Sequence, residues 1–406
     1  MNLRLKRTGA DAPLAPFIIS LALIAFIVPL AIDLYVPGMP TMSKEFSVSD
    51  GQVQMTLAVY LLAMALGQII FGPLSDAYGR RRPLFTGLGV FFLGALLCAL
   101  TPDFRLLLLF RFIQGLGGSA TVVVMYSAIR DRAQGPRAAK LYSVVVALGA
   151  IAPVLGPGIG GLIVDGAGWR WSFVAMALSG LLVMLLASKG MAESLAVENR
   201  TSFPPPNVGR IYLGALSNKR FIIPALGLSL LYAMLFVVVG GSPFVLQQSY
   251  GLSPSTYGLA FSALAVSMAI AAPVAGWLSG RFGEKPIATI SAAVVVVGSI
   301  GTAMSLDYDA KLWILLSALF VLLVGLGMAE PTLASMSMSA AVTNIGSHAA
   351  VLGTLQYTLS ALAIPLSGAA LDGSTTAWGV LLLLIAAAAF IMVVFSNRAL
   401  DRIETH

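Results

Sequence analysis

Long apolar runs constrain the fold of this chain more than any other feature. Twelve of them recur, at roughly 15–37, 53–72, 84–100, 105–128, 139–163, 171–189, 221–243, 257–280, 286–305, 312–333, 349–371 and 377–396. Most are long enough for an α-helix to cross about 30 Å of hydrocarbon. A lone strand would leave backbone polar groups unpaired in lipid, and the alternating pattern of a membrane β-barrel is absent. The sequence therefore predicts an all-α integral membrane protein that crosses the bilayer about twelve times.

The charged residues predict how these spans are oriented. Only 10% of the residues are charged, and the formal net charge of +7 could by itself suggest nucleic-acid binding. Most of the 24 Lys and Arg residues, however, fall in alternate loops, as Arg4, Lys6 and Arg7 at the N-terminus and Arg80–Arg82 illustrate. The positive-inside rule then predicts that both termini lie in the cytoplasm, and nucleic acid is not expected as a partner.

The sequence lacks the residue sets of common catalytic and cofactor sites. Cys98 is the only cysteine, and His348 and His406 are the only histidines. No thiol cluster, zinc site or Ser-His-Asp set is therefore expected. The segment 156–161 fits the dinucleotide pattern G-x-G-x-x-G, but no strand precedes it, and no ATP-binding G-x-x-x-x-G-K-[ST] occurs. We expect no cofactor, no use of ATP and no enzymatic reaction.

The chain contains an internal repeat. Gly72-Pro-Leu-Ser-Asp-Ala-Tyr-Gly79 is echoed 204 residues later by Gly276-Trp-Leu-Ser-Gly-Arg-Phe-Gly283, and a weaker echo relates 157–163 to 365–371. A polar, proline-rich interval separates the copies. We therefore predict an N-terminal six-helix half at 1–190, a cytoplasmic linker at 191–219 and a C-terminal six-helix half at 220–406. Parallel repeats of six spans are typical of transporters whose solute site lies between the halves.

Several stretches together resemble one family of transporters. They are Ala31-Ile-Asp-Leu-Tyr-Val-Pro37, Gln68-Ile-Ile-Phe-Gly-Pro-Leu-Ser-Asp-Ala-Tyr-Gly-Arg-Arg-Arg-Pro83, Arg111-Phe-Ile-Gln-Gly-Leu-Gly117, Ala152-Pro-Val-Leu-Gly-Pro-Gly-Ile-Gly-Gly161, Ser242-Pro-Phe-Val-Leu-Gln247 and Gly353-Thr-Leu-Gln356. The chain resembles the major facilitator superfamily, and within it the twelve-span drug:H⁺ antiporters of the bicyclomycin and chloramphenicol resistance branch. The resemblance implies the major facilitator fold, with twelve transmembrane helices in two pseudo-symmetric six-helix halves. It also implies a bacterial inner (cytoplasmic) membrane and a monomer.

Two motifs are expected to govern the change between conformations. Gly72 and Gly79 permit close backbone approach, while Asp76 and the arginines can bond to neighbouring helix ends. By resemblance this loop latches the outward-open state; the alternative is that the arginines only enforce orientation. The expected gating residues are Gly72, Asp76, Gly79, Arg80, Arg81 and Arg130. Arg130 belongs to the Arg130-Asp131 pair after span four, which is a candidate partner of the loop. In the second copy, Gly280 replaces Asp76, so a weaker latch is expected there.

The fifth span is rich in glycine and proline, which remove side-chain bulk and kink a helix. The resemblance associates this pattern with exporters rather than uptake symporters, in addition to a role in helix packing. The residues of this antiporter motif are Pro153, Gly156, Pro157, Gly160 and Gly161.

Charged residues inside apolar runs are the sharpest functional signal, since each costs about 2.5–3.5 kcal/mol near mid-bilayer on insertion scales. Asp33 lies towards the periplasmic end of span one; it is either an exposed helix-end residue or, by resemblance, a proton and substrate ligand. Arg111 either lines the central cavity or neutralises a carboxylate, and an opposite charge at Asp33 would lower the cost of both. Glu330 is expected near the cytoplasmic end of span ten, facing water, as a reserve proton site. Asp372 is expected to be solvated.

The wall of the substrate cavity is harder to assign, because aromatic residues and methionines occur in nearly every span. Adaptable apolar walls suit substrates of varied shape. The candidate residues are Tyr35, Tyr60, Gln114, Tyr232, Phe236 and Gln356.

These features lead to a hypothesis of a proton-driven exporter of small amphipathic drugs or metabolites that works by alternating access. Its partners are a small solute, protons and the lipid bilayer, and the proton gradient takes the place of a cofactor. An uptake symporter on the same fold is the first alternative, and a non-transporting membrane enzyme or receptor is the second. The sequence does not identify the solute.

Overall fold

The structure is a computed structural model that describes residues 14–133, 141, 145, 147–201, 208–339 and 345–404. Some of the basic residues used to predict orientation lie outside this part, including Arg4, Lys6, Arg7, Arg137 and Lys140. The described residues contain 12 helical segments that are long and apolar enough to cross a membrane. No strand occurs among them. The predicted all-α fold with twelve spans is therefore confirmed.

The helices of the first half follow the predicted runs closely. They are α1 (Leu14–Asp33), which continues through the short helices η2 (Val36–Gly38) and α2 (Met39–Phe46), then α3 (Asp50–Tyr78), α4 (Arg81–Leu100), α5 (Phe104–Arg132), α7 (Ile151–Ala167) and α8 (Trp169–Gly190). The short helices η3 (Val197–Asn199) and α9 (Val208–Ser217) lie between the halves in sequence. The second half comprises α10 (Lys219–Phe244), η4 (Val245–Ser249), α11 (Pro254–Phe282), α12 (Glu284–Asp307), α13 (Leu312–Met338), α14 (Ile345–Gly373) and α15 (Thr375–Glu404).

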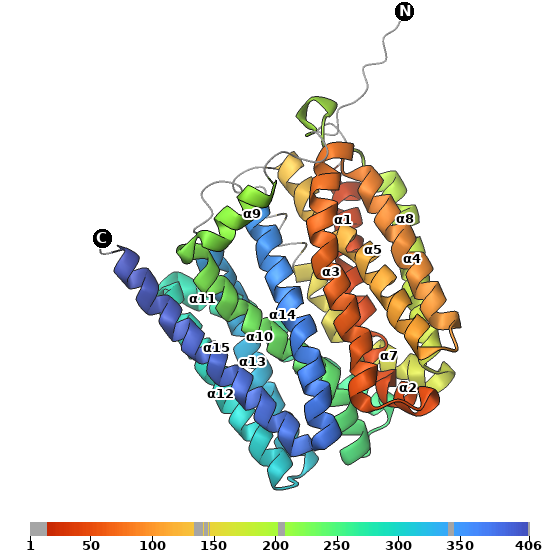
Figure 1. Cartoon of the computed structure of the whole chain (residues 1–406), viewed down its shortest axis with the longest axis vertical. Coiled ribbons are helices and arrows are strands. Elements are labelled where there is room, and N and C mark those ends of the chain that lie inside the picture. Colours follow the sequence, from red (N-terminus) through yellow and green to blue (C-terminus); the bar gives the residue numbers. More distant parts are fainter. Residues whose placement is uncertain are drawn as a thin grey trace, which may run out of the picture.

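The two halves form two helical bundles that lie side by side (Figure 1). The C-terminal end of α15 and helix α9 lie at one end of the molecule, which we call the terminal side; α2 lies at the opposite end, the distal side (Figure 1). The bundles meet along two helix pairs, α3 with α14 and α7 with α11. Each pair joins a helix of one half to a helix of the other, so the junction contains two equivalent helix–helix contacts.

The internal repeat is visible in matching helix ends. Helices α3 and α11 each contain 29 residues, and their bounds differ by the same 204 positions as the sequence motif. Each begins at a serine cap, Ser49 or Ser253, whose hydroxyl accepts a hydrogen bond from a backbone N–H three residues later. Each ends at a glycine with positive φ, 86° at Gly79 and 89° at Gly283, a conformation that glycine adopts without strain. The two halves are thus pseudo-symmetric in detail.

Carboxylates close the distal side by capping helices of the opposite half. Asp372 of α14 accepts hydrogen bonds from the Ser49 hydroxyl at 2.9 Å and the Gly51 N–H at 3.2 Å. Asp165 of α7 accepts a hydrogen bond from the Ser255 N–H at 3.0 Å. Both carboxylates therefore lie at the positive N-terminal end of a helix, α3 or α11. Asp372 is exposed, as predicted, and the start of α3 in addition supplies hydrogen-bond donors to its carboxylate.

Helix α13 is longer than the apolar run from which it was predicted. The run ends at 333, and Pro331 suggested a nearby helix end, yet α13 continues through Pro331 to Met338. A proline inside a membrane helix is tolerated where neighbouring groups satisfy the freed backbone. This difference of one and a half turns changes the location of Glu330, which is described below.

Candidate functional site

Asp33 is the last residue of α1, and its side chain is buried, with 6% of its surface exposed. It packs directly against the fifth span: a Cβ added to Gly156 would lie 2.7 Å from the Asp33 Cβ and 3.7 Å from its carboxylate oxygen. The ion pairs of the described residues do not include Asp33. The alternative of an exposed helix-end aspartate is therefore excluded. A buried carboxylate without a cationic partner is costly in its ionised form.

Arg111 of α5 is fully buried inside the first half and is surrounded by aromatic rings. Its guanidinium carbon lies 4.4 Å from the ring centre of Tyr35, 4.3 Å from that of Tyr60 and 5.6 Å from that of Phe173. Faces of aromatic rings attract cations, most strongly where water is excluded. The guanidinium is thus stabilised by three rings.

Backbone and amide oxygens complete the surroundings of Arg111. The guanidinium donates hydrogen bonds to the Thr56 carbonyl at 3.2 Å, the Ala31 carbonyl at 3.1 Å and the Gln114 side-chain oxygen at 2.7 Å. The Ala31 carbonyl is free to accept because α1 ends at Asp33. The alternative that Arg111 neutralises a carboxylate is not seen among the described residues, since neutral oxygens and rings occupy the contacts that a carboxylate would need.

The predicted cavity residues of the first half lie together around Arg111. Tyr35, Tyr60 and Gln114 are fully buried. The Tyr35 hydroxyl is hydrogen-bonded to Thr56 at 3.1 Å, and the Gln114 amide contacts the Met176 sulfur at 3.6 Å. The Tyr60 hydroxyl, by contrast, is buried without a hydrogen-bond partner, as is one terminal nitrogen of Arg111. In this conformation these side chains support Arg111 inside the half.

The fifth-span motif connects the first span to the second half. On one side of α7, a Cβ at Gly160 would lie 2.2 Å from the Leu34 carbonyl oxygen, and Gly156 contacts Asp33 as described. On the other side, a Cβ at Gly161 would lie 2.3 Å from the Pro254 carbonyl oxygen. The close packing predicted for this motif is confirmed. A displacement of Asp33 can therefore reach α11 through a single intervening helix.

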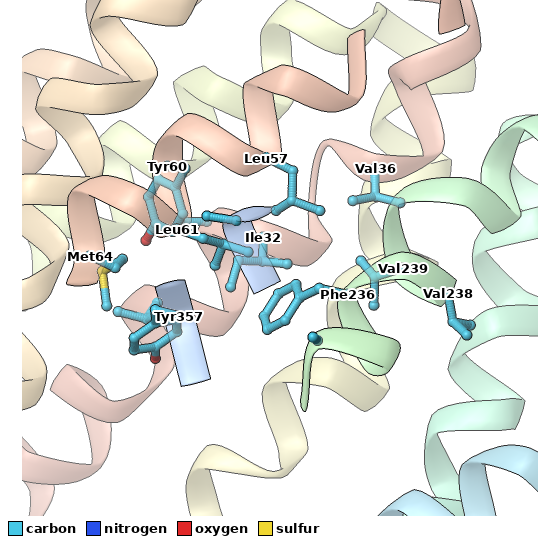
Figure 2. Close-up of a cluster of buried hydrophobic side chains, with 14 of the residues drawn as sticks. Ile32, Val36, Leu57, Tyr60, Leu61, Met64, Phe236, Val238, Val239 and Tyr357 are labelled. Carbon is cyan, nitrogen blue, oxygen red and sulfur yellow. The ribbon is translucent and has the colours of Figure 1, made fainter. Parts of the chain in front are cut away.

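Apolar side chains of both halves meet beside this site (Figure 2). Phe236 and Val239 of α10 and Tyr357 of α14 face a surface from the first half. The residues of that surface are Ile32, Val36, Leu57, Tyr60, Leu61 and Met64. Phe236 was predicted to line the cavity, and it lies at the centre of this cluster (Figure 2). The junction of the halves thus presents an adaptable apolar wall.

Glu330 lies within α13, not at its end. It lies eight positions before Met338, which corresponds to about 12 Å of helix. Its side chain is exposed, and its carboxylate lies within electrostatic range of the hydroxyls of Tyr232 and Tyr357. Pro331 does not end the helix, so Glu330 lies about two turns before the end of α13 rather than at its last turn. Glu330 is therefore an exposed residue in electrostatic range of tyrosines on α10 and α14.

Tyr232, a predicted cavity residue, belongs to an aromatic group around Glu330. Its ring centre lies 5.2 Å from that of Phe236 and 5.9 Å from that of Tyr357. Its hydroxyl is hydrogen-bonded to that of Tyr357, and Tyr126 of α5 lies in electrostatic range of both. Sequence reasoning missed Tyr357 and Tyr126. Tyr357 follows the predicted Gln356, a half-buried residue, so the motif pointed to the correct turn of α14.

The gating loop is organised around Arg80. This buried side chain donates hydrogen bonds to Asp76, to the Ser75 hydroxyl at 2.8 Å and to Asp131 at 2.7 and 3.2 Å. Burial alone lowers the pKa of the Arg80 guanidinium, but its hydrogen bonds and charge interactions with Asp131 and Asp76 outweigh burial and raise the pKa above its ordinary value. Arg80 thus remains charged. The partner in the pair 130–131 is Asp131, whereas Arg130 is exposed.

The start of the segment after α8 also binds this loop. Glu193 accepts hydrogen bonds from the N–H groups of Arg80 and Arg81 at 2.8 and 3.2 Å, at the N-terminus of α4. The Arg81 side chain donates to the Ser188 carbonyl at 2.9 Å. Glycine is favoured at position 79 because its φ is 86° and because a Cβ would lie 2.5 Å from a Glu193 oxygen. The close approach predicted at Gly72 was wrong for this conformation: the nearest atom to a Cβ there is the Tyr212 hydroxyl, at 3.8 Å.

The second copy of the loop lies next to a recess of about 280 Å³ between α11, α12 and α13. Gly276, Ser279, Gly280, Glu284, Thr332 and Ser335 are among its lining residues. Glu284 follows Arg80 by the repeat distance of 204 residues, so an acid replaces the base, and its carboxylate accepts a hydrogen bond from Ser335. The arginine network of the first loop is therefore not repeated, in agreement with the expected weaker latch.

Two pseudo-symmetric bundles of six spans, with charged side chains inside the membrane region and an apolar junction, define a secondary transporter of the alternating-access class. Residues 21–365 match the family model described as Major Facilitator Superfamily, so the chain belongs to that superfamily. It is thus a multi-pass membrane protein of a family of small-molecule transporters.

Relatives support the more specific resemblance to the drug-exporter branch. The chain is 31% identical over 356 residues to the uncharacterized MFS-type transporter YdgK of Bacillus subtilis, covering 86% of this chain and 87% of that protein. It is 26% identical to a bicyclomycin resistance protein homolog of Haemophilus influenzae, covering 85% and 87%. It is 27% identical to the multidrug resistance protein MdtL of Escherichia coli, covering 73% and 75%.

Solved structures agree with the fold. A partially occluded inward open conformation of the xylose transporter XylE from E. coli superposes with a TM-score of 0.73 at 15% identity, covering 94% of this chain and 97% of that one. A D-xylose-proton symporter gives the same TM-score at 18% identity, covering 93% and 97%. At these identities the likeness concerns the fold alone.

Proposed function

We propose that this protein is a proton-coupled exporter of small amphipathic drugs or metabolites, located in a bacterial inner membrane with its terminal side in the cytoplasm. The observation that carries the proposal is the location of Asp33: a buried carboxylate without an ion-pair partner among the described residues, packed on the glycine motif that contacts the other half. The relatives named for bicyclomycin and multidrug resistance support export.

Protonation of Asp33 links the gradient to the change of conformation. The ionised carboxylate favours substrate loading from the cytoplasm, and a proton from the acidic outside removes the charge and releases the substrate. Because Asp33 lies against Gly156, a changed position of α1 is passed through α7 to α11. One proton that enters down a potential of 100 mV supplies about 2.3 kcal/mol, enough for a roughly fifty-fold solute gradient.

Transport into everted membrane vesicles tests this proposal. A panel of amphenicols, dyes and small metabolites is presented outside, and accumulation is followed before and after the pH gradient is collapsed. We expect gradient-dependent accumulation of at least one compound by the natural protein and its loss in Asp33→Asn. The matched control is Asp307→Asn, an exposed aspartate at the distal end of α12, which is expected to transport normally.

Two results would contradict the proposal in different ways. Transport by Asp33→Asn with unchanged pH dependence would remove Asp33 from the proton pathway. Proton-driven movement in the opposite direction, from the distal to the terminal side, would establish the uptake symporter instead.

A further inference from the structure

We infer that the recess between α11, α12 and α13 binds an organic cation that donates hydrogen bonds through N–H groups, namely an alkylguanidinium or a primary ammonium. The recess has a volume of about 280 Å³ and lies where α11 ends and α12 begins, at the opposite end of α11 from the Asp165 cap. Asp33 lies in a different part of the molecule, against α7, so binding here is independent of the proposed export function.

The first half contains a guanidinium at the equivalent position of its fold. There Arg80 donates hydrogen bonds to the Ser75 hydroxyl and to the carboxylates of Asp76 and Asp131. Hydrogen bonds between a guanidinium and carboxylates are charge-assisted and are among the strong ones in proteins. The start of α4 and the ends of α3 and α5 are therefore held together by a cation that the chain itself supplies.

The internal repeat identifies the counterparts of these residues in the second half. A Cβ at Gly94 would lie 2.7 Å from the Gln114 nitrogen, and one at Gly298, 204 residues later, would lie 2.4 Å from the Leu322 nitrogen. Residues of α5 and α13 therefore correspond at a distance of 208, whereas the loop repeats after 204. The counterparts of Ser75, Asp76, Arg80 and Asp131 are Ser279, Gly280, Glu284 and Ser339. The second half thus keeps a serine and one carboxylate at this position but supplies no cation.

The hydroxyl groups around Glu284 present oxygen lone pairs rather than hydrogens to a ligand. The Ser335 hydroxyl donates its hydrogen to the Glu284 carboxylate, and the Thr332 hydroxyl donates to the Met328 carbonyl at 2.9 Å. The Ser279 hydroxyl lies 3.5 Å from that of Thr332. Hydroxyls whose hydrogens are already engaged act as acceptors. A recess of acceptors with one negative charge selects a cation that carries N–H donors and rejects an anion.

The charge of Glu284 is left to a ligand by the basic side chain next to it in sequence. The ion pairs of the described residues do not include Glu284. The Arg281 guanidinium carbon instead lies 5.9 Å from the ring centre of Trp277 and 5.6 Å from that of Phe282, and Arg281 does not line the recess. A metal ion would need several acidic or imidazole ligands, and the described residues contain no group of three or more His, Cys, Asp or Glu side chains that could hold one.

Gly280 provides space for the ligand. A Cβ at this position would meet no atom within 4 Å, and the same holds at Gly276 one turn earlier. In the first half, this position carries the Asp76 carboxylate that binds the guanidinium. An aspartate at 280 would therefore add a second negative charge beside the ligand without a steric clash, which makes a gain of affinity testable.

Equilibrium dialysis of radiolabelled methylguanidinium against the purified full-length protein tests the site. Glu284→Gln removes the charge and is expected to weaken binding by about 10- to 100-fold. Gly280→Asp restores the carboxylate of the first half and is expected to strengthen binding by roughly two- to fivefold. The control Asp307→Asn removes a carboxylate at the other end of α12 and is expected to bind like the natural protein.

Competing ligands define the chemistry and the source of the cation. Ethanolamine is expected to displace methylguanidinium at concentrations at which choline does not, because choline lacks N–H donors for the hydroxyl oxygens. Dialysis is repeated with the protein in nanodiscs of phosphatidylethanolamine or phosphatidylcholine. Weaker binding in phosphatidylethanolamine would identify a lipid headgroup as the source of the ammonium, and equal binding in both lipids would identify a soluble cation.

Several results would overturn this assignment. One is an absence of measurable methylguanidinium binding by the natural protein in detergent and in both lipids. Another is a Glu284→Gln variant that elutes and melts like the natural protein and binds the probe equally well. Displacement by choline as strong as that by ethanolamine would exclude contact with the hydroxyl oxygens. A folded Gly280→Asp variant with unchanged or weaker binding would place any bound cation outside the recess.

Discussion

At the scale of single residues, Arg111 shows how a buried cation can be held without a carboxylate. Two tyrosine rings lie within 4.4 Å of its guanidinium, and three oxygens accept its hydrogen bonds. The two tyrosines differ in one respect: the Tyr35 hydroxyl is hydrogen-bonded to Thr56, but the Tyr60 hydroxyl is buried without a partner. A buried unpaired hydroxyl is destabilising, whereas a satisfied one contributes about 1 kcal/mol.

This difference predicts opposite effects for a matched pair of substitutions. Tyr35→Phe is expected to lower the free energy of unfolding by about 1 kcal/mol, because the hydrogen bond between Tyr35 and Thr56 is lost, while Thr56 keeps its bond to the Val53 carbonyl. Tyr60→Phe is expected to leave the stability unchanged or raise it by up to about 1 kcal/mol, because the ring over Arg111 remains. Thermal unfolding of the two purified variants in one detergent measures both. Equal destabilisation would show that the Tyr60 hydroxyl has a partner in the membrane.

At the scale of secondary structure, α7 matters because it contacts α1 on one side and α11 on the other. Close contact requires glycine at positions 156, 160 and 161, where a Cβ would lie 2.2–2.7 Å from an atom of a neighbouring helix. Gly166 belongs to the same helix but has no such neighbour within 4 Å. The helix therefore contains both critical and free glycines.

Alanine substitutions separate these two kinds of glycine. Gly160→Ala and Gly161→Ala are expected to destabilise the protein by about 1–3 kcal/mol, since the added methyl group forces α7 away from Leu34 or Pro254. Gly166→Ala is expected to be neutral or stabilising by up to about 1 kcal/mol, because alanine favours the helix. Thermal unfolding and vesicle transport measure the consequences. Comparable losses in all three variants would mean that helix propensity, not interhelical contact, decides the effect.

Helices were the part of the fold that the sequence predicted best, because lipid requires long apolar runs to be helical. The repeat and the motifs further indicated the halves and the loop around Arg80. Helix ends were predicted less well: the apolar run of span ten ends at 333, but α13 extends to Met338, since backbone hydrogen bonding does not depend on apolar side chains. Partners distant in sequence were also missed, such as Tyr357 beside Glu330 and Ser49 beside Asp372. Hydropathy and spacing contain no information about which helix faces meet.

At the scale of the whole molecule, closure of the distal side depends on two carboxylates that cap helices across the junction. Asp372 binds the start of α3, and Asp165 binds the start of α11. A charged cap of this kind contributes about 0.5–2 kcal/mol. The two caps together can therefore shift the balance between conformations by roughly five- to several-hundred-fold.

Removal of the caps is expected to open the distal side. Asp165→Asn and Asp372→Asn should each increase the population open at that side, and the double variant should do so most strongly. Spin labels placed at distal ends of α3 and α14 report the separation by electron paramagnetic resonance. Asp309→Asn, another distal aspartate whose left-handed backbone (φ 45°) asparagine also tolerates, is the control. Unchanged distances in the double variant would show that apolar contacts alone keep this side closed.

The mirrored caps also describe how the molecule is assembled. In a symmetric dimer, any contact between patch i and patch j of two identical subunits forms twice, as i with j and j with i. The two helix pairs of the junction follow that rule within one chain. Span five (α7) contacts span eight (α11), and span eleven (α14) contacts span two (α3). The junction is therefore that of a homodimer whose subunits are covalently joined. Such a design lets one copy lose a feature, as Gly280 replaces Asp76, while the other copy retains it.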